Sequence, residues 1–193
     1  EHPINMYAYS KYLFDQYIRR NLTTLDNQVV GLRFFNVYGP HEDHKGPMSS
    51  VVFHANNQIK ENGKIKLYGK LDEVAAGEQK RDFVYVDDCV NVALWMIENP
   101  HISGIFNLGT GKAETFNLLA QSVIKWHGYG EIEYVDFPDH LKDVYQNFTQ
   151  ADLNLLRSVG YKKNFRTISK GVFDYLDWMN GEICLSPNRS TDD

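Results

Sequence analysis

The sequence predicts an α/β fold in which buried parallel strands alternate with helices. Two apolar runs, at residues 29–35 and 104–108, have the continuous character of strands that are covered on both faces. A third run at 82–86 leads directly into a helical pattern. The chain has 193 residues, of which 42% are hydrophobic, so it is long enough to bury a core of ordinary domain size.

The first element is an amphipathic helix over residues 7–20. Leu13, Phe14, Tyr17 and Ile18 recur there at helical spacing, and charged residues occupy much of the remainder. The strand at 29–35 follows and is expected to end in a loop.

That loop spans residues 36–40, whose Gly-Pro ending is typical of a turn. The strand at 82–86 precedes a helix that runs to about Asn99, with Asp87 or Asp88 as its N-terminal cap.

The third strand is followed by a turn at 109–111 and by a helix from about Phe116 to His127. This Gly-Thr-Gly turn lacks the third glycine of a dinucleotide-binding loop, and we interpret it as a tight structural turn. A doubly wound nucleotide-binding fold opens with a strand, a Gly-rich turn and a helix. Because no such opening is present, we expect the chain to begin inside a larger fold.

The composition favours small-molecule chemistry. The net charge of -5 comes from interspersed acids and bases, so neither nucleic acid nor a membrane surface is expected as a partner. The two cysteines, Cys89 and Cys184, form no metal-binding or disulfide pattern, which indicates a reducing compartment, the cytoplasm, and no metal site. Residues 183–193 are polar and are expected to form a flexible tail.

Tyr7 and Lys11 carry the first chemical hypothesis. They are one helical turn apart and therefore lie on the same face of the first helix. A neighbouring ammonium stabilises the ionised form of a phenol, which makes Tyr7 a candidate acid/base for a sugar hydroxyl. A Tyr-xxx-Lys pair is also common by chance, and taken alone it fits an ordinary surface pair better than a catalytic one.

Four segments in order resemble the extended short-chain dehydrogenases/reductases: Tyr7-xxx-Lys11, RFFNVYGP at 33–40, RDFVYVDD at 81–88 and FNLG at 106–109. Four further segments resemble the ADP-L-glycero-D-manno-heptose 6-epimerases within that group: PINMY at 3–7, HKGPMSS at 44–50, GEQKR at 77–81 and YQNFTQADL at 145–153. The family's Gly-rich cofactor turn and upstream catalytic Ser or Thr have no counterpart here.

The resemblance implies that Tyr7 and Lys45 are two catalytic acid/base groups and that NADP is the cofactor. Lys11, Val37 and Lys45 would contact the cofactor. The residues implied for the nucleotide sugar are Asn36, Pro47, His54, Tyr68, Arg81 and Tyr145. The inversion needs two acid/base groups, because the oxygen of the flat ketone moves to a second position that one fixed phenol does not reach.

Alternatives from the residues remain for several of these positions. Lys45 also fits a solvated loop lysine, His54 a structural histidine on a helix, and Arg81 a structural cation paired with Asp82 or Asp87.

The resemblance also implies the architecture: the C-terminal half of a Rossmann-type doubly wound parallel sheet with an interleaved smaller α/β substrate domain. The remainder of the NADP-binding domain would comprise 1–38 and 82–111, and the substrate-binding domain 39–81 and 112–182. ADP-heptose would be the substrate, in the synthesis of the lipopolysaccharide inner core. The protein would be a homo-oligomer, as a pentamer.

Two other functions are consistent with the same segments. One is another nucleotide-sugar 4-epimerase or dehydratase of the superfamily, because the Tyr7/Lys11 pair and the strand motifs are shared among them. The other is a catalytically incompetent fragment that keeps the fold and lacks the cofactor cradle. Lys45 favours the 6-epimerase over another enzyme of the superfamily. Binding of NADP would distinguish an active enzyme from an incompetent fragment.

Overall fold

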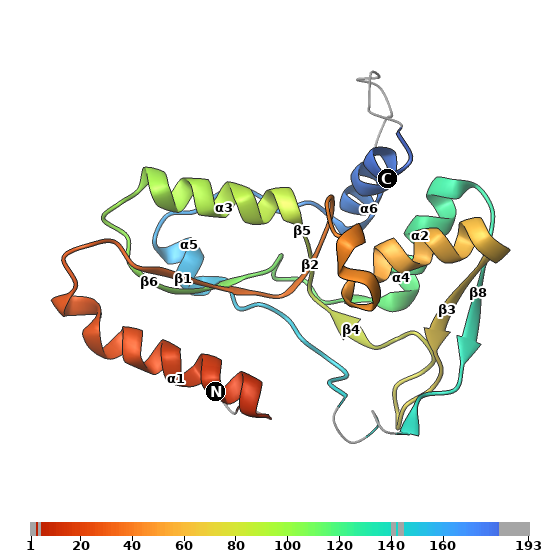
Figure 1. Cartoon of the computed structure of the whole chain (residues 1–193), viewed down its shortest axis with the longest axis horizontal. Helices are drawn as coiled ribbons and strands as arrows, with labels where there is room; N and C mark the ends of the chain where they lie inside the picture. The colour runs from red at the N-terminus through yellow and green to blue at the C-terminus, as the bar shows by residue number, and fades with distance from the viewer. Residues whose placement is uncertain (1–2, 4, 140–141, 143–144, 182–193) are drawn as a thin grey trace.

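The computed structural model describes residues 3, 5–139, 142 and 145–181 of the chain. The predicted flexible tail at 183–193 and Cys184 lie outside the described residues. The described part confirms the α/β class, with parallel strand pairs flanked by helices (Figure 1).

Strand β1 (Val30–Phe34) pairs in parallel with β6 (Gly104–Leu108). Helix α3 (Val86–Glu98) covers one side of this pair and helix α1 (Met6–Asn21) lies on the other (Figure 1). A hydrophobic cluster joins α3 to β6 and to the short helix α5 (Asn154–Ser158). Phe106 and Leu108 are fully buried within it, as the continuous apolar run at 104–108 predicts.

Residues 36–38 correct the prediction of a loop, because they form strand β2 (Asn36–Tyr38). The Phe35 N–H donates to Leu108 and the next N–H, that of Asn36, donates to Asp82. The chain thus changes partner at this point, from β6 to β5 (Phe83–Tyr85), again in parallel. Extended structure therefore ends at Tyr38, three residues later than predicted, directly before the Gly-Pro turn signal.

Helix α3 corrects the predicted cap as well. Its N-terminal cap residue is Tyr85, which makes no side-chain cap hydrogen bond, and both aspartates lie in the first helical turn. Asp88 is buried and accepts two hydrogen bonds from Arg166, one from the backbone N–H and one from the guanidinium at 2.7 Å. The Asp88 carboxylate is thus paired with a cation and does not cap the helix.

The other half of the molecule is built around a third parallel pair, β3 (Lys64–Tyr68) and β8 (Glu131–Val135). Helices α2 (Val51–Asn62), α4 (Phe116–His127) and α6 (Ile168–Met179) pack beside it and share a second hydrophobic cluster. The described residues also include four shorter elements: η1 (Leu22–Thr24), η2 (Asp43–Met48) and the antiparallel pair of β4 (Lys80–Arg81) with β7 (Glu114–Thr115).

Helix α4 has the predicted bounds, and its two ends explain why. The Thr115 hydroxyl accepts a hydrogen bond from the Leu118 N–H at the start, and Gly128 ends the helix in the left-handed conformation. Among the described residues, no helix is long and apolar enough to cross a membrane.

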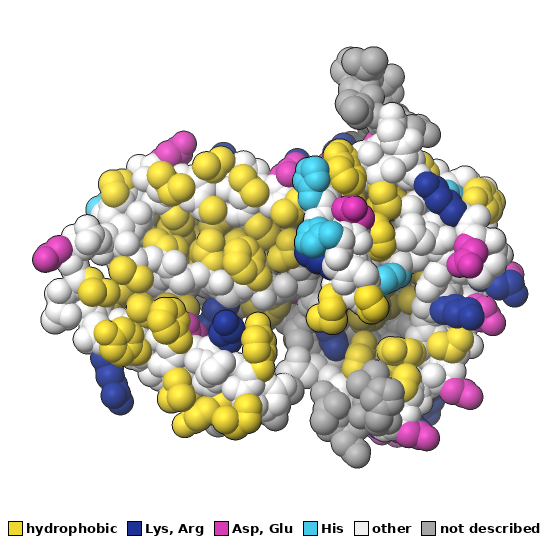
Figure 2. Space-filling view, in the orientation of Figure 1, with side chains coloured by type: hydrophobic (Ala, Val, Ile, Leu, Met, Phe, Trp, Pro, Cys, Tyr) yellow, Lys and Arg dark blue, Asp and Glu magenta, His cyan; other side chains and the backbone are white. Residues whose placement is uncertain are grey.

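Helix α1 is confirmed within a residue or so at each end, and its apolar side chains stay exposed. Leu13, Phe14 and Tyr17 are 49%, 63% and 64% exposed, and no residue of the helix is fully buried. Hydrophobic side chains gather over this half of the molecule (Figure 2). The domain boundaries proposed from the sequence stay a prediction.

Candidate active site

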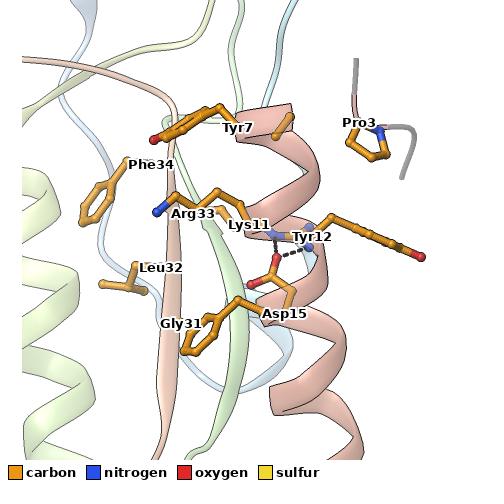
Figure 3. A pocket seen from close by; sticks show the side chains of 11 residues that line it. Pro3, Tyr7, Lys11, Tyr12, Asp15, Gly31, Leu32, Arg33 and Phe34 are labelled. Atoms are coloured by element: carbon orange, nitrogen blue, oxygen red, sulfur yellow. Dashed lines mark hydrogen bonds and ion pairs between the residues drawn. The ribbon is translucent and has the colours of Figure 1, made fainter. Parts of the chain in front are cut away.

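Tyr7 and Lys11 project from α1 toward strand β1 (Figure 3). Asn5 starts this helix by accepting a hydrogen bond from the Ala8 N–H at 2.8 Å, which sets the register of the first turn. The Lys11 Nζ atom lies 5.3 Å from the centroid of the Tyr7 ring. The Lys11 ammonium thus lies over the Tyr7 ring, which is 72% exposed, and the acid/base role of Tyr7 stays a prediction.

The two side chains line a cavity of about 670 Å³ between α1 and β1. Behind them, Arg33 of β1 donates from Nε to Asp15 of α1 at 2.7 Å. This ion pair ties the helix to the strand. It was not predicted, although Asp15 follows Lys11 by one helical turn and lies on the same face.

Asn36, Val37 and Lys45 line a second cavity of about 310 Å³. Strand β2 supplies the first two, and the exposed 3-10 helix η2 supplies Lys45. Gly46 has φ 54° within η2, a conformation that favours glycine and turns the chain directly after Lys45. Tyr7 and Lys45 line different cavities.

Arg81, Tyr68 and Tyr145 form a third group. The Arg81 guanidinium carbon lies 4.9 Å from the centroid of the Tyr145 ring, and the Tyr68 and Tyr145 rings meet edge to face at 6.4 Å. Burial lowers the pKa of Arg81, and burial raises the pKa of Tyr145 while the Arg81 charge opposes that rise. Phe116 and Phe137, which the sequence analysis did not single out, complete the aromatic surroundings.

The alternative pairing of Arg81 with Asp82 or Asp87 is not what the structure has. Asp87 lies 3.6 Å from Arg166. Asp82 is fully buried, and its two carboxylate oxygens accept from the backbone N–H groups of Thr110, Gly111 and Ala151 and from the Thr110 hydroxyl, at 2.7–3.0 Å. Arg81 itself donates to the Lys80 carbonyl.

The same contacts confirm that residues 109–111 form a tight structural turn. Two of its N–H groups are already bonded to Asp82, so they do not face outward as a phosphate cradle would. A Cβ atom on Gly109 would lie 2.7 Å from an Asp82 oxygen, which explains the glycine there.

His54 lies on α2, as predicted, with its ring 5.8 Å from that of Phe53. Pro47 is exposed on η2. Neither residue lines the two cavities described above. Within the described residues, no group of three or more His, Cys, Asp or Glu side chains is placed to hold a metal ion.

Residues 1–109 match the NAD dependent epimerase/dehydratase family. The chain is 56% identical, over 97% of its length, to an ADP-L-glycero-D-manno-heptose-6-epimerase of Alkalilimnicola ehrlichii. It spans 59% of that relative.

Two solved structures are similar to the chain as well. The ADP-L-glycero-D-manno-heptose-6-epimerase of Helicobacter pylori has a TM-score of 0.77 at 28% identity, with 93% of this chain and 52% of that one covered. The UDP-glucose 4-epimerase of Thermotoga maritima has a TM-score of 0.74 at 27% identity, with 95% and 56% covered. These neighbours confirm the Rossmann-type α/β class.

Proposed function

We propose, because this chain belongs to the NAD dependent epimerase/dehydratase family, that it forms the substrate-facing part of an NADP-dependent epimerase. The reaction is inversion at C6 of the heptose in ADP-D-glycero-D-manno-heptose, through a transient 6-keto sugar. The identity of 56% with a heptose 6-epimerase along 97% of the chain supports this substrate. The proposal includes a role in lipopolysaccharide inner-core synthesis, a cytoplasmic location and a homo-oligomer.

One observation supports the role of Lys45: Asn36, Val37 and Lys45 line a single cavity, whereas Tyr7 and Lys11 line another. In this proposal Asn36 binds the sugar, Val37 packs against the nicotinamide, and Lys45 contacts the cofactor and acts as the second acid/base. The exposed Lys45 ammonium has the freedom to reach an oxygen that changes position during inversion.

The described residues fit the nicotinamide end of the cofactor. The exposed Lys11 ammonium is suited to donate to ribose hydroxyls, and the half-buried Val37 offers an apolar surface for a flat ring. The bound cofactor would accept hydride from the sugar and return it. Tyr7 would exchange a proton with the sugar hydroxyl on one side, and Lys45 would do so on the other.

Arg81, Tyr145 and Tyr68 suit the nucleotide diphosphate. A guanidinium held by an aromatic ring presents its remaining N–H groups in a fixed orientation, which favours bidentate bonding to phosphate oxygens. In the proposal His54 and Pro47 also contact the substrate.

The test uses a chimera in which this chain replaces the matched region of the Alkalilimnicola relative. Tyr7→Phe should lower kcat by about 10² to 10⁴ while leaving the fold intact, since it removes only a hydroxyl. Retention of more than about a tenth of the activity would refute this role.

Lys45→Met should abolish inversion of C6 while keeping some hydride exchange on the face that Tyr7 serves, measured with a simpler aldehyde. Methionine keeps most of the side-chain volume and removes the charge. Only the double variant, Tyr7→Phe with Lys45→Met, is expected to lose both inversion and hydride exchange. Inversion at the normal rate in Lys45→Met would refute the two-base mechanism.

The same chimera discriminates the rival reactions. UDP-glucose 4-epimerisation or dehydration of a nucleotide sugar, with no turnover of ADP-heptose, would assign the chain to another branch of the superfamily. The similarity to the Thermotoga 4-epimerase makes this the relevant comparison.

A further inference from the structure

Glu42 is a buried carboxylate that lines the same cavity as Lys45 and that the sequence analysis left without a role. It is 3% exposed, although the residues after it, from Asp43 to Met48, are all exposed. An ionisable group so deep beside an exposed loop needs compensating hydrogen bonds.

Three donors converge on the Glu42 side chain. The Ser50 N–H donates to Oε2 at 2.7 Å, and the Ser50 hydroxyl donates to Oε1 at 2.6 Å. The hydroxyl of Tyr175, which is buried in α6, also hydrogen-bonds to Glu42; burial first, and then this hydrogen bond, raise the pKa of Tyr175.

The Glu42 backbone closes the loop from the same point. Its carbonyl oxygen accepts from the Lys45 N–H at 3.0 Å and from the Ser49 hydroxyl at 2.7 Å. Ser50 is in turn the N-terminal cap of α2. Both ends of the loop that carries Lys45 are therefore anchored at Glu42, and through Tyr175 to α6.

We propose that Glu42 is a positioning residue that fixes the 43–48 loop so that the Lys45 ammonium faces the cavity. The kinetic part of this inference rests on the proposed function. The anchoring itself depends on neither cofactor nor substrate. Displacement of a catalytic group by about 1 Å costs up to about a hundredfold in rate, so an anchor of this kind has a measurable effect.

The first test uses the chain alone and the rate of tryptic cleavage after Lys45, followed by mass spectrometry. Glu42→Gln leaves one acceptor oxygen for three donors, so the loop should open more often and cleavage after Lys45 should accelerate about tenfold. Cleavage after Lys112, which is exposed and hydrogen-bonds to Thr110 rather than to Glu42, should not change.

Two further variants make this test decisive. Tyr175→Phe keeps the buried ring and removes one donor, and it should accelerate cleavage after Lys45 by a smaller factor, which also carries the test if Glu42→Gln does not fold. Glu61→Gln removes the same charge from an exposed position on α2 and should have no effect. Unchanged cleavage after Lys45 in both Glu42→Gln and Tyr175→Phe overturns the proposal.

The second test is a double-mutant cycle in the chimera. Glu42→Gln should lower kcat for epimerisation about ten- to a hundredfold, with KM changed by less than about threefold. In a Lys45→Met background it should have little effect on the hydride exchange that this background retains. An equal loss in both backgrounds would show that Glu42 does not act through Lys45. If the unaltered chimera does not epimerise ADP-heptose, the proposed function fails, while the cleavage result still decides the anchoring.

Discussion

At the scale of single residues, some charged side chains form ion pairs within the fold, and others have no acidic partner in the contacts described. Arg166 forms ion pairs with three aspartates, Asp87, Asp88 and Asp174, so its charge is already paired within the fold. Arg81 is surrounded by aromatic rings. This difference is why Arg81, and not Arg166, is the candidate for an anionic substrate.

Arg81→Ala should therefore raise KM for the nucleotide sugar more than it lowers kcat. Binding of the diphosphate is the same in the ground state and the transition state, so its loss weakens both equally. A rise of about tenfold or more in KM is expected from one charge-assisted hydrogen-bonding group. Steady-state kinetics of the chimera check this, and an unchanged KM would reassign Arg81 as structural.

At the scale of secondary-structure elements, local signals predicted some bounds well. The helix at 116–127 and the strand at 104–108 match residue for residue, because each has a strong start or end signal: Thr115 and Gly128 for α4, and an uninterrupted apolar run for β6. Strand β2 was missed because its partner, β5, is more than forty residues away in sequence. Only long-range pairing makes Asn36 to Tyr38 extended.

Other elements had signals that the sequence analysis did not use. Strand β3 alternates exposed lysines with buried Ile65 and Leu67, which is the pattern of a half-buried strand. Helix α6 begins after the cap Thr167 and buries Ile168, Val172 and Tyr175 at helical spacing.

The sequence predicts the motif residues of the candidate site but not the contacts that hold them in place. Its motif residues are recognisable one by one, whereas the anchors behind them depend on contacts across the fold. Asp82 meets Ala151 and Glu42 meets Tyr175, over separations that no local pattern encodes.

Asp82 joins three elements, since it connects the start of β5 to the turn after β6 and to the segment before α5. Asp82→Asn should lower the free energy of unfolding by about 2–4 kcal/mol, because either orientation of the amide turns its NH2 group toward buried N–H donors. Urea unfolding of the chain measures this. Asp136→Asn, at an exposed position, is the control and should change stability by less than about 0.5 kcal/mol. Equal stabilities of the two variants would contradict the role of Asp82 as a buried acceptor.

At the scale of the whole molecule, the described residues supply only some of the binding groups that a nucleotide-sugar enzyme needs. They include the groups proposed for the sugar and the nicotinamide. The one Gly-rich turn that follows a strand among them, at 109–111, has its N–H groups bonded to Asp82. Binding of the cofactor's pyrophosphate, which the Rossmann fold places at a glycine-rich turn and a helix N-terminus, therefore has no candidate among the described residues.

The chain alone should consequently bind NADP at least about a hundredfold more weakly than the chimera does, since phosphate contacts supply several charge-assisted hydrogen bonds. Isothermal titration of both proteins measures the ratio. Lys11→Met should weaken binding in the chimera, because the proposed ribose contact is lost, and should have almost no effect in the chain alone. If the chain alone bound NADP within about tenfold of the chimera, a phosphate site would have to exist among these 193 residues, and the turn at 109–111 would need to release Asp82 to form it.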